Sequence, residues 1–147
     1  MKKFFILFVL FLLPVNSYAL IEVDITRGNL NPLPVAVSPL SIDENSKKQF
    51  KDILDKEDVG AEISNVVENN LRTSGLFNPL NKDAFLQAPD IANLKPRFED
   101  WNLIKAQALI TGKVNFEDGK LRVEFRLWDV LAGKEMMALA FTTVPTN

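Results

Sequence analysis

Two runs of alternating apolar residues near the end of the chain, Ala108–Phe116 and Leu121–Leu127, constrain its fold more than any other feature. The dipeptide Asp118-Gly119 lies between them. Asp-Gly favours a two-residue hairpin turn, because both central positions of that turn require positive φ. The sequence therefore predicts an antiparallel hairpin with its apolar residues on one face.

The turn also fixes which residues of the hairpin lie opposite each other, since a two-residue loop leaves no freedom in the register. Apolar side chains then meet on one face, and an opposite-charge pair forms on the other. The predicted pairs are Phe116 with Leu121, Val114 with Val123, Ile110 with Leu127 and, on the second face, Lys113 with Glu124.

Residues 59–73 have the spacing of an amphipathic helix. Asp58 is placed to cap its free amides, and Arg72 lies near the negative end of the helix dipole. Gly75 then ends the helix, because a residue without Cβ suits the left-handed conformation, and Phe77 is expected to fold back over the last turn. The stripe expected to face the core consists of Val59, Ile63, Val66, Val67 and Leu71.

Three further segments read as strands: Leu20–Thr26, Pro34–Leu40 and Glu135–Thr143. The first alternates apolar and polar residues, the second is short and uncharged as in a strand buried on both faces, and the third follows a turn at Ala132-Gly133. Strands followed by helices and then more strands predict an α+β fold. We expect a mixed, mainly antiparallel sheet of about five strands with helices packed on one face.

The two remaining segments carry weaker patterns. Residues 41–58 are polar and predict a short surface helix, and residues 78–106 are loop-rich, with a short helix near 97–105. The apolar residues expected to pack inward are Phe50, Ile53 and Leu54 in the first segment and Trp101, Leu103 and Ile104 in the second.

The start of the chain has the composition of a secretory signal peptide. Lys2 and Lys3 precede the apolar run Phe4–Leu13, and Ser17-Tyr18-Ala19 supplies a small-x-small exit. The alternative is a membrane anchor, but a bilayer span takes about 20 apolar residues and this run is shorter. We therefore expect residues 1–19 to be cleaved, residues 20–147 to form one domain, and the mature protein to be exported to a bacterial periplasm.

Composition excludes several functions. The chain has no Cys and no His, so no zinc site of the usual kind, no Ser-His-Asp triad and no cysteine nucleophile can form. Removing the two leader lysines changes the net charge from −2 to −4, which argues against a nucleic-acid partner. We expect no catalytic residue, no cofactor, no metal and no small-molecule substrate.

One acidic cluster has the composition of a possible metal site. The residues Asp52, Asp55, Glu57 and Asp58 suggest a calcium loop, but the twelfth position counted from Asp55 is Val66, where such a loop needs an acid. A solvated, charged helix end is the better interpretation.

Two stretches together resemble a known family, the amino-terminal domain of TolB. "IEVDITRGNLNPLPVAV" follows the leader, and "ALITGKV…DGKLRVEFRLWDVLAGKEM" matches the closing hairpin and third strand. The resemblance covers nearly all of residues 20–143. Its sharpest part is the string formed by Leu71, Arg72, Ser74, Gly75, Phe77, Pro79 and Leu80.

The resemblance implies a non-enzymatic adaptor of the periplasmic Tol-Pal system, which supports outer-membrane integrity, division-linked constriction and bacteriocin and phage DNA import. In the family, the first residues of the mature protein bind the carboxy-terminal domain of TolA. Pal binds a β-propeller that this chain does not include, so Pal is a partner only if a propeller follows. The chain is then a fragment of a longer protein or a truncated product.

The residues themselves allow two interpretations of the predicted partner-binding segment. An extended terminal strand can add to the edge of a partner's sheet, or it can pair permanently in its own domain. The resemblance favours the first. The segment consists of Leu20, Ile21, Glu22, Val23, Asp24, Ile25, Thr26 and Arg27.

Two other functions remain open from the sequence. A general periplasmic module could hold a ligand or protein between helix and sheet, beside the loops of residues 78–106. A hydrolase using Asp and Glu is the least supported, because no pair of carboxylates has a spacing that suggests a shared site.

Overall fold

The computed structural model describes residues 31–55, 58–89 and 95–144. The predicted first strand, Leu20–Thr26, lies outside these residues. None of the described helices is both long and apolar enough to cross a membrane. In chain order the elements are β1 (Leu33–Val37), β2 (Ser41–Ile42), α2 (Glu44–Leu54), α3 (Val59–Thr73), β3 (Phe77–Pro79), a 3-10 turn η1 (Lys82–Ala84), α4 (Phe98–Leu103), β4 (Ala108–Glu117), β5 (Lys120–Asp129) and β6 (Lys134–Thr143).

The strands form one mixed, six-stranded sheet in the order β3-β1-β4-β5-β6, and β2 extends the β1 side by pairing with β4. The pairs of β1 with β3, β1 with β4 and β2 with β4 are parallel and short. The long pairs, β4 with β5 and β5 with β6, are antiparallel. The predicted α+β class with a mixed, mainly antiparallel sheet is confirmed.

The hairpin has the predicted register. All four predicted pairs are present, and the Lys113 Nζ lies 3.7 Å from a Glu124 carboxylate oxygen. Asp118 and Gly119 both have positive φ, 50° and 74°, as the two-residue turn requires. The third predicted strand is β6, which begins one residue earlier than expected.

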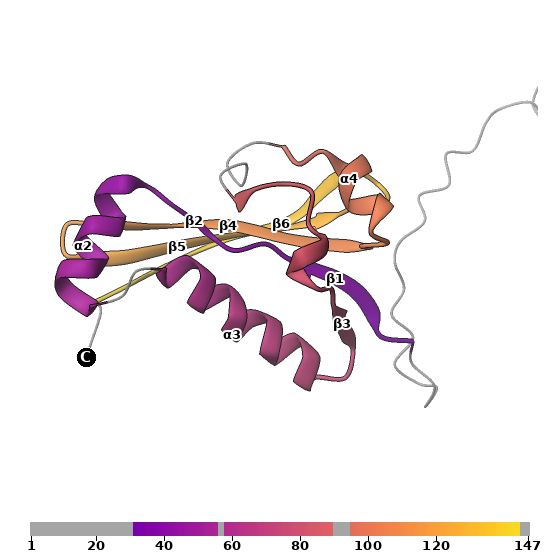
Figure 1. Ribbon diagram of the computed structural model, residues 1–147, viewed down its shortest axis with the longest axis horizontal. Coiled ribbons are helices and arrows are strands. Elements are labelled where there is room, and N and C mark those ends of the chain that lie inside the picture. Colours follow the sequence, from indigo (N-terminus) through magenta and orange to yellow (C-terminus); the bar gives the residue numbers. More distant parts are fainter. Residues whose placement is uncertain (1–30, 56–57, 90–94, 145–147) are drawn as a thin grey trace, which may run out of the picture. The chain divides into compact units, whose positions relative to one another are not determined.

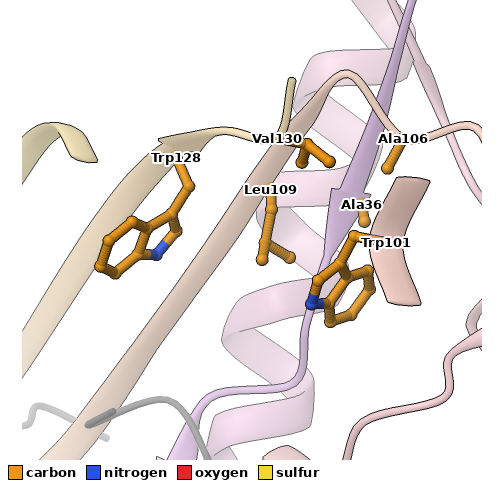
Figure 2. Packing of buried hydrophobic residues seen from close by; sticks show 6 residues of the cluster. All are labelled: Ala36, Trp101, Ala106, Leu109, Trp128 and Val130. Carbon is orange, nitrogen blue, oxygen red and sulfur yellow. The ribbon is translucent and has the colours of Figure 1, made fainter. Parts of the chain in front are cut away.

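The helices lie on both sides of the sheet (Figure 1), so the prediction that they pack on one face is wrong for the short α4. The longer helices, α2 and α3, cover one face, which we call the α3 face. There the clusters pack around Phe50, Val114 and Val123 and around Val35, Val37 and Ala108. The short α4 covers part of the opposite face, the α4 face, where Trp101 packs with Leu109 and Trp128. Figure 2 shows this cluster, made up of Ala36, Trp101, Ala106, Leu109, Trp128 and Val130.

The predicted boundaries of α3 are confirmed. The Asp58 carboxylate accepts a hydrogen bond of 2.8 Å from the Ala61 amide at the start of the helix. Gly75 has φ of +72° after its end. Near the first turn, Gly60 lies against β2, where an added Cβ would be 2.2 Å from the Leu40 carbonyl oxygen. The helix therefore approaches the sheet as closely as only glycine permits.

For three residues, the prediction that the side chain packs inward is wrong. Neighbouring helical positions differ by about 100° around the axis, so only one residue of an adjacent apolar pair can face the sheet. In each such pair the second residue packs and the first does not. The exposed residues are Ile53, Val66 and Leu103, at 49%, 61% and 71% of their full exposure, and their packed neighbours are Leu54, Val67 and Ile104.

Candidate functional site

The residues of the family string, Leu71 to Leu80, make contacts that hold the fold together. Leu71 and Phe77 pack against the cluster around Val35, so the chain does fold back over the end of α3. The Ser74 hydroxyl donates to the Leu71 carbonyl oxygen at 2.6 Å and accepts from the Leu76 amide at 3.2 Å. These contacts fix the turn that joins α3 to β3.

The rest of the string ties α3 to the segment after β3. The guanidinium of Arg72 donates to Glu68 at 2.6 Å, and the Lys82 ammonium lies 3.2 Å from the other oxygen of that carboxylate. Burial would raise the pKa of Glu68, but the hydrogen bonds and charges of Arg72 and Lys82 outweigh it and hold the pKa below its ordinary value. Pro79 ends β3, and Leu80 packs against the Trp101 cluster.

The predicted partner-binding residues, Leu20 to Arg27, lie outside the described residues. The structure therefore does not test that site. Among the described residues, the unusual surface is instead β6 and the sheet next to it.

The strand β6 is the last strand of the sheet, and all ten of its residues are exposed. From Met136 to Thr143 it contains no charged residue and no proline. Natural edge strands usually carry lysine, proline or a bulge to prevent another strand from pairing with them. The only irregularity here is a register shift opposite Leu127 and Trp128, near the start of β6.

An apolar groove runs beside this strand on the α3 face. Its volume is about 280 Å³. On one side lies Val67 of α3, and on the other lie Met137 and Leu139 of β6. Phe141 continues the β6 row and contacts Phe125 edge to face, with ring centroids 6.3 Å apart. The floor is formed by Ile110, Phe125 and Leu127, with Arg126 at the margin.

The α4 face of the same strands is charged rather than apolar. Glu124 is bound by Arg122 at 2.9 Å and lies near Lys113, while Arg126 is 3.7 Å from Glu135. Partial burial would raise the pKa of Glu124, but the Arg122 hydrogen bond and the neighbouring cations outweigh it, so its pKa lies below the ordinary value.

The pKa shifts resolved among the described residues come from structural contacts. The resolved pKa shifts, at Asp43, Glu68 and Glu124, are all downward. Each comes from a helix cap or an ion pair, and a general acid would need a raised pKa. Within the described ranges, no three acidic side chains gather as metal ligands.

Sequence reasoning missed the groove. The strand itself was predicted, as residues Glu135–Thr143 after the turn at Ala132-Gly133, and that part is correct. The groove could have been expected by comparing the width of the sheet face with the width that the predicted helices can cover. Residues 59–73 form the one long helix predicted for the α3 face, and a single helix covers only about 10 Å of a sheet.

The fold defines a class of small α+β domains. The carboxy-terminal domain of LpoB from Escherichia coli superposes with a TM-score of 0.55 at 12% identity, covering 81% of this chain and 87% of that one. TolB from Acinetobacter baumannii gives 0.54 at 19% identity, covering 78% of this chain and 23% of that one. At these identities the likeness shows the fold alone.

The sequence comparison is far closer. The model of the TolB amino-terminal domain matches residues 21–136, and the chain belongs to that family. The Tol-Pal system protein TolB of Pelagibacter ubique (strain HTCC1062) is 78% identical over all 147 residues. The chain spans about a third of that relative, 32% of its length.

Proposed function

We propose that this chain is the amino-terminal part of a periplasmic adaptor of the Tol-Pal system, without enzymatic activity. The observation that carries the proposal is its 78% identity, along its whole length, to a Tol-Pal system protein. In this role it supports outer-membrane integrity, division-linked constriction and bacteriocin import. Binding to Pal depends on a propeller encoded after residue 147.

The partner-binding segment in this proposal is Leu20 to Arg27, which adds as a strand to the sheet of the TolA carboxy-terminal domain. Ile21, Val23 and Ile25 are the apolar anchors, and the acids between them select a basic partner surface. A strand of this length gives a small interface, with a Kd on the order of micromolar.

Titration calorimetry with the TolA carboxy-terminal domain tests this proposal. The chain from Leu20 is expected to bind, and deletion of residues 20–27 or the substitution Val23→Lys is expected to abolish binding. The matched control is Val66→Lys, which places the same charge at a valine that is already 61% exposed on α3. Equal binding by the deleted form and the chain from Leu20 would overturn the proposal.

A second candidate function is a module that holds an apolar ligand or peptide in the α3–β6 groove. The lining by Val67, Met137 and Leu139 favours it. A rise in melting temperature on addition of an apolar ligand, without TolA and abolished by Leu139→Glu, would support it. A melting temperature that no ligand shifts would remove it.

A further inference from the structure

The edge of β4 beyond β2 is covered by a helix instead of a strand. β2 pairs with Lys113 and Val114, and no described strand pairs on that side with residues 115–117. The Phe116 amide instead donates a hydrogen bond of 2.9 Å to the hydroxyl of Ser46, in the first turn of α2. Ser46 therefore takes the place of a strand partner, and a covering helix is one way in which proteins protect a sheet edge.

The same hydroxyl belongs to the cap of α2. It donates to the Asp43 carboxylate at 2.6 Å, and this carboxylate also accepts from the amides of Asn45 and Ser46 at 3.0 and 2.9 Å. Ser46 is buried, at 2% of its full exposure. One chain of hydrogen bonds thus runs from the Phe116 amide through Ser46 to the N-cap of α2.

Both buried residues of α2 contact Phe116. The Phe50 ring meets the Phe116 ring edge to face, with centroids 5.8 Å apart, and Ser46 binds the Phe116 amide. Leu54 packs at the margin of the same cluster, and the other eight of the eleven residues of α2 are exposed. The contacts that hold α2 therefore converge on one residue of β4.

The neighbouring helix, α3, is held more firmly. The hydroxyl of its buried Ser64 accepts from the Leu40 amide at 3.0 Å and lies 3.1 Å from the Ser38 carbonyl oxygen. Its residues in the core clusters are Val59, Ile63, Val67 and Leu71. Separation of α2 alone thus exposes less apolar surface than unfolding of the sheet with α3, and elements with few buried contacts open first.

We propose that α2 is a strap over the β4 edge, which opens as a unit while the rest of the fold stays intact. Closed, it satisfies the Phe116 amide and buries Phe50. Open, it leaves residues 115–117 as an unpaired edge beside the apolar side chains of Val114 and Leu121. The strap therefore determines whether this edge is accessible to a second strand.

Native-state hydrogen exchange of the chain from Leu20, followed by NMR in 0 to about 2 M urea, tests the proposal. The amides of α2 beyond its first turn and the Phe116 amide are expected to share one protection factor. It is expected to be at least about 100-fold below that of the amides that pair β4 with β5, and to depend weakly on urea, because local opening exposes little surface.

Two substitutions separate local opening from global unfolding. Ser46→Ala leaves the Phe116 amide without its acceptor when α2 is closed, and is expected to speed exchange of α2 and Phe116 about 5- to 100-fold. Val130→Ala, in the cluster on the α4 face, is expected to speed exchange of the β4–β5 amides about 10-fold. It is expected to leave α2 unchanged, because the packing of Val130 stays intact when α2 alone opens.

The control for Ser46→Ala is Thr73→Ala. It also removes a hydroxyl, but one that is exposed and donates to the Asn69 carbonyl oxygen within α3. Exchange of α2 and of Phe116 is expected to stay unchanged in this variant.

Three results would overturn the proposal. Equal acceleration of α2 and of the β4–β5 amides by Val130→Ala would mean that α2 opens only by global unfolding. Unchanged exchange of α2 in Ser46→Ala would mean that the serine does not hold the strap. A Phe116 amide as protected as the β4–β5 amides would mean that α2 does not uncover this edge, and that result needs no variant.

Discussion

The strands β4 and β6 are both ten residues long, both antiparallel to β5 and both alternating in sequence, yet their surroundings differ completely. Leu109 and Val114 of β4 have no exposed surface, whereas every residue of β6 is exposed. Alternation therefore shows which side chains share a face. It does not show whether anything covers that face.

The difference has an energetic consequence. Among the described residues, β4 is stabilised by pairing on both sides and by packing on both faces, while β6 has pairing on one side and one partly open groove. Burial of apolar area is the dominant favourable term in folding. β4 is therefore expected to contribute more to the stability of the fold than β6.

The largest expected effect is a difference in unfolding free energy between the same substitution, Leu→Ala, in β4 and in β6. Leu109→Ala removes a fully buried side chain and is expected to cost about 3 kcal/mol of unfolding free energy, from lost burial and the cavity left behind. Leu139→Ala, at 47% exposure, is expected to cost under about 1 kcal/mol. Urea denaturation of both variants measures this. Equal costs would mean that β6 is covered as well as β4.

An intermediate effect concerns the hydrogen bond that joins β4 to β5 on the α4 face. The Trp128 indole donates to the Thr111 hydroxyl at 2.9 Å, and both residues are buried. Trp128→Phe is expected to cost about 1–2 kcal/mol, since the hydroxyl loses its partner and the cluster loses volume. The double variant with Thr111→Val is the check. It should cost less than the sum of the two single changes.

The smallest expected effect compares the charge pairs on the two sides of β5. Glu124 has its pKa held below the ordinary value near 4.5, so its ionised form stabilises the fold above that pH. This contribution is lost as the pH falls through the lowered pKa. Glu124→Gln is therefore expected to reduce stability by under about 1 kcal/mol at pH 7 and to change little near pH 3.

Glu135→Gln is the matched control for that substitution, since its pair with Arg126 is longer, 3.7 Å, and more exposed. Urea midpoints for both variants at pH 7 and pH 3 distinguish them. A larger pH-dependent loss at Glu135 than at Glu124 would contradict the difference drawn between the two sides of β5.

Much of the fold could be predicted because the signals were local. Asp118-Gly119 specified both the turn and the register of the hairpin, and Asp58 and Gly75 marked the ends of α3. Such residues act within a few positions of themselves, through φ angles and free amides. No tertiary contact was needed to interpret them.

The wrong predictions of burial fall at residues whose environment is set by elements distant in the chain. Val66 and Val67 are equally apolar in sequence, but only Val67 faces the sheet. Leu103 was expected in the core because apolar residues at helical spacing usually pack inside, but α4 turns it outward. The candidate groove was missed for the same reason, because its existence depends on where α3 ends its coverage of the sheet.

The sequence by itself determined the hairpin register, the limits of the main helix, the α+β class and the absence of histidine and cysteine chemistry. Tertiary structure alone decided which apolar face is covered, which residue of each apolar pair packs, and that β6 is the outermost strand among the described residues and lies beside a groove. The physical reason is one of range. Turns and caps depend on backbone groups a few residues apart, whereas burial depends on segments distant in the chain.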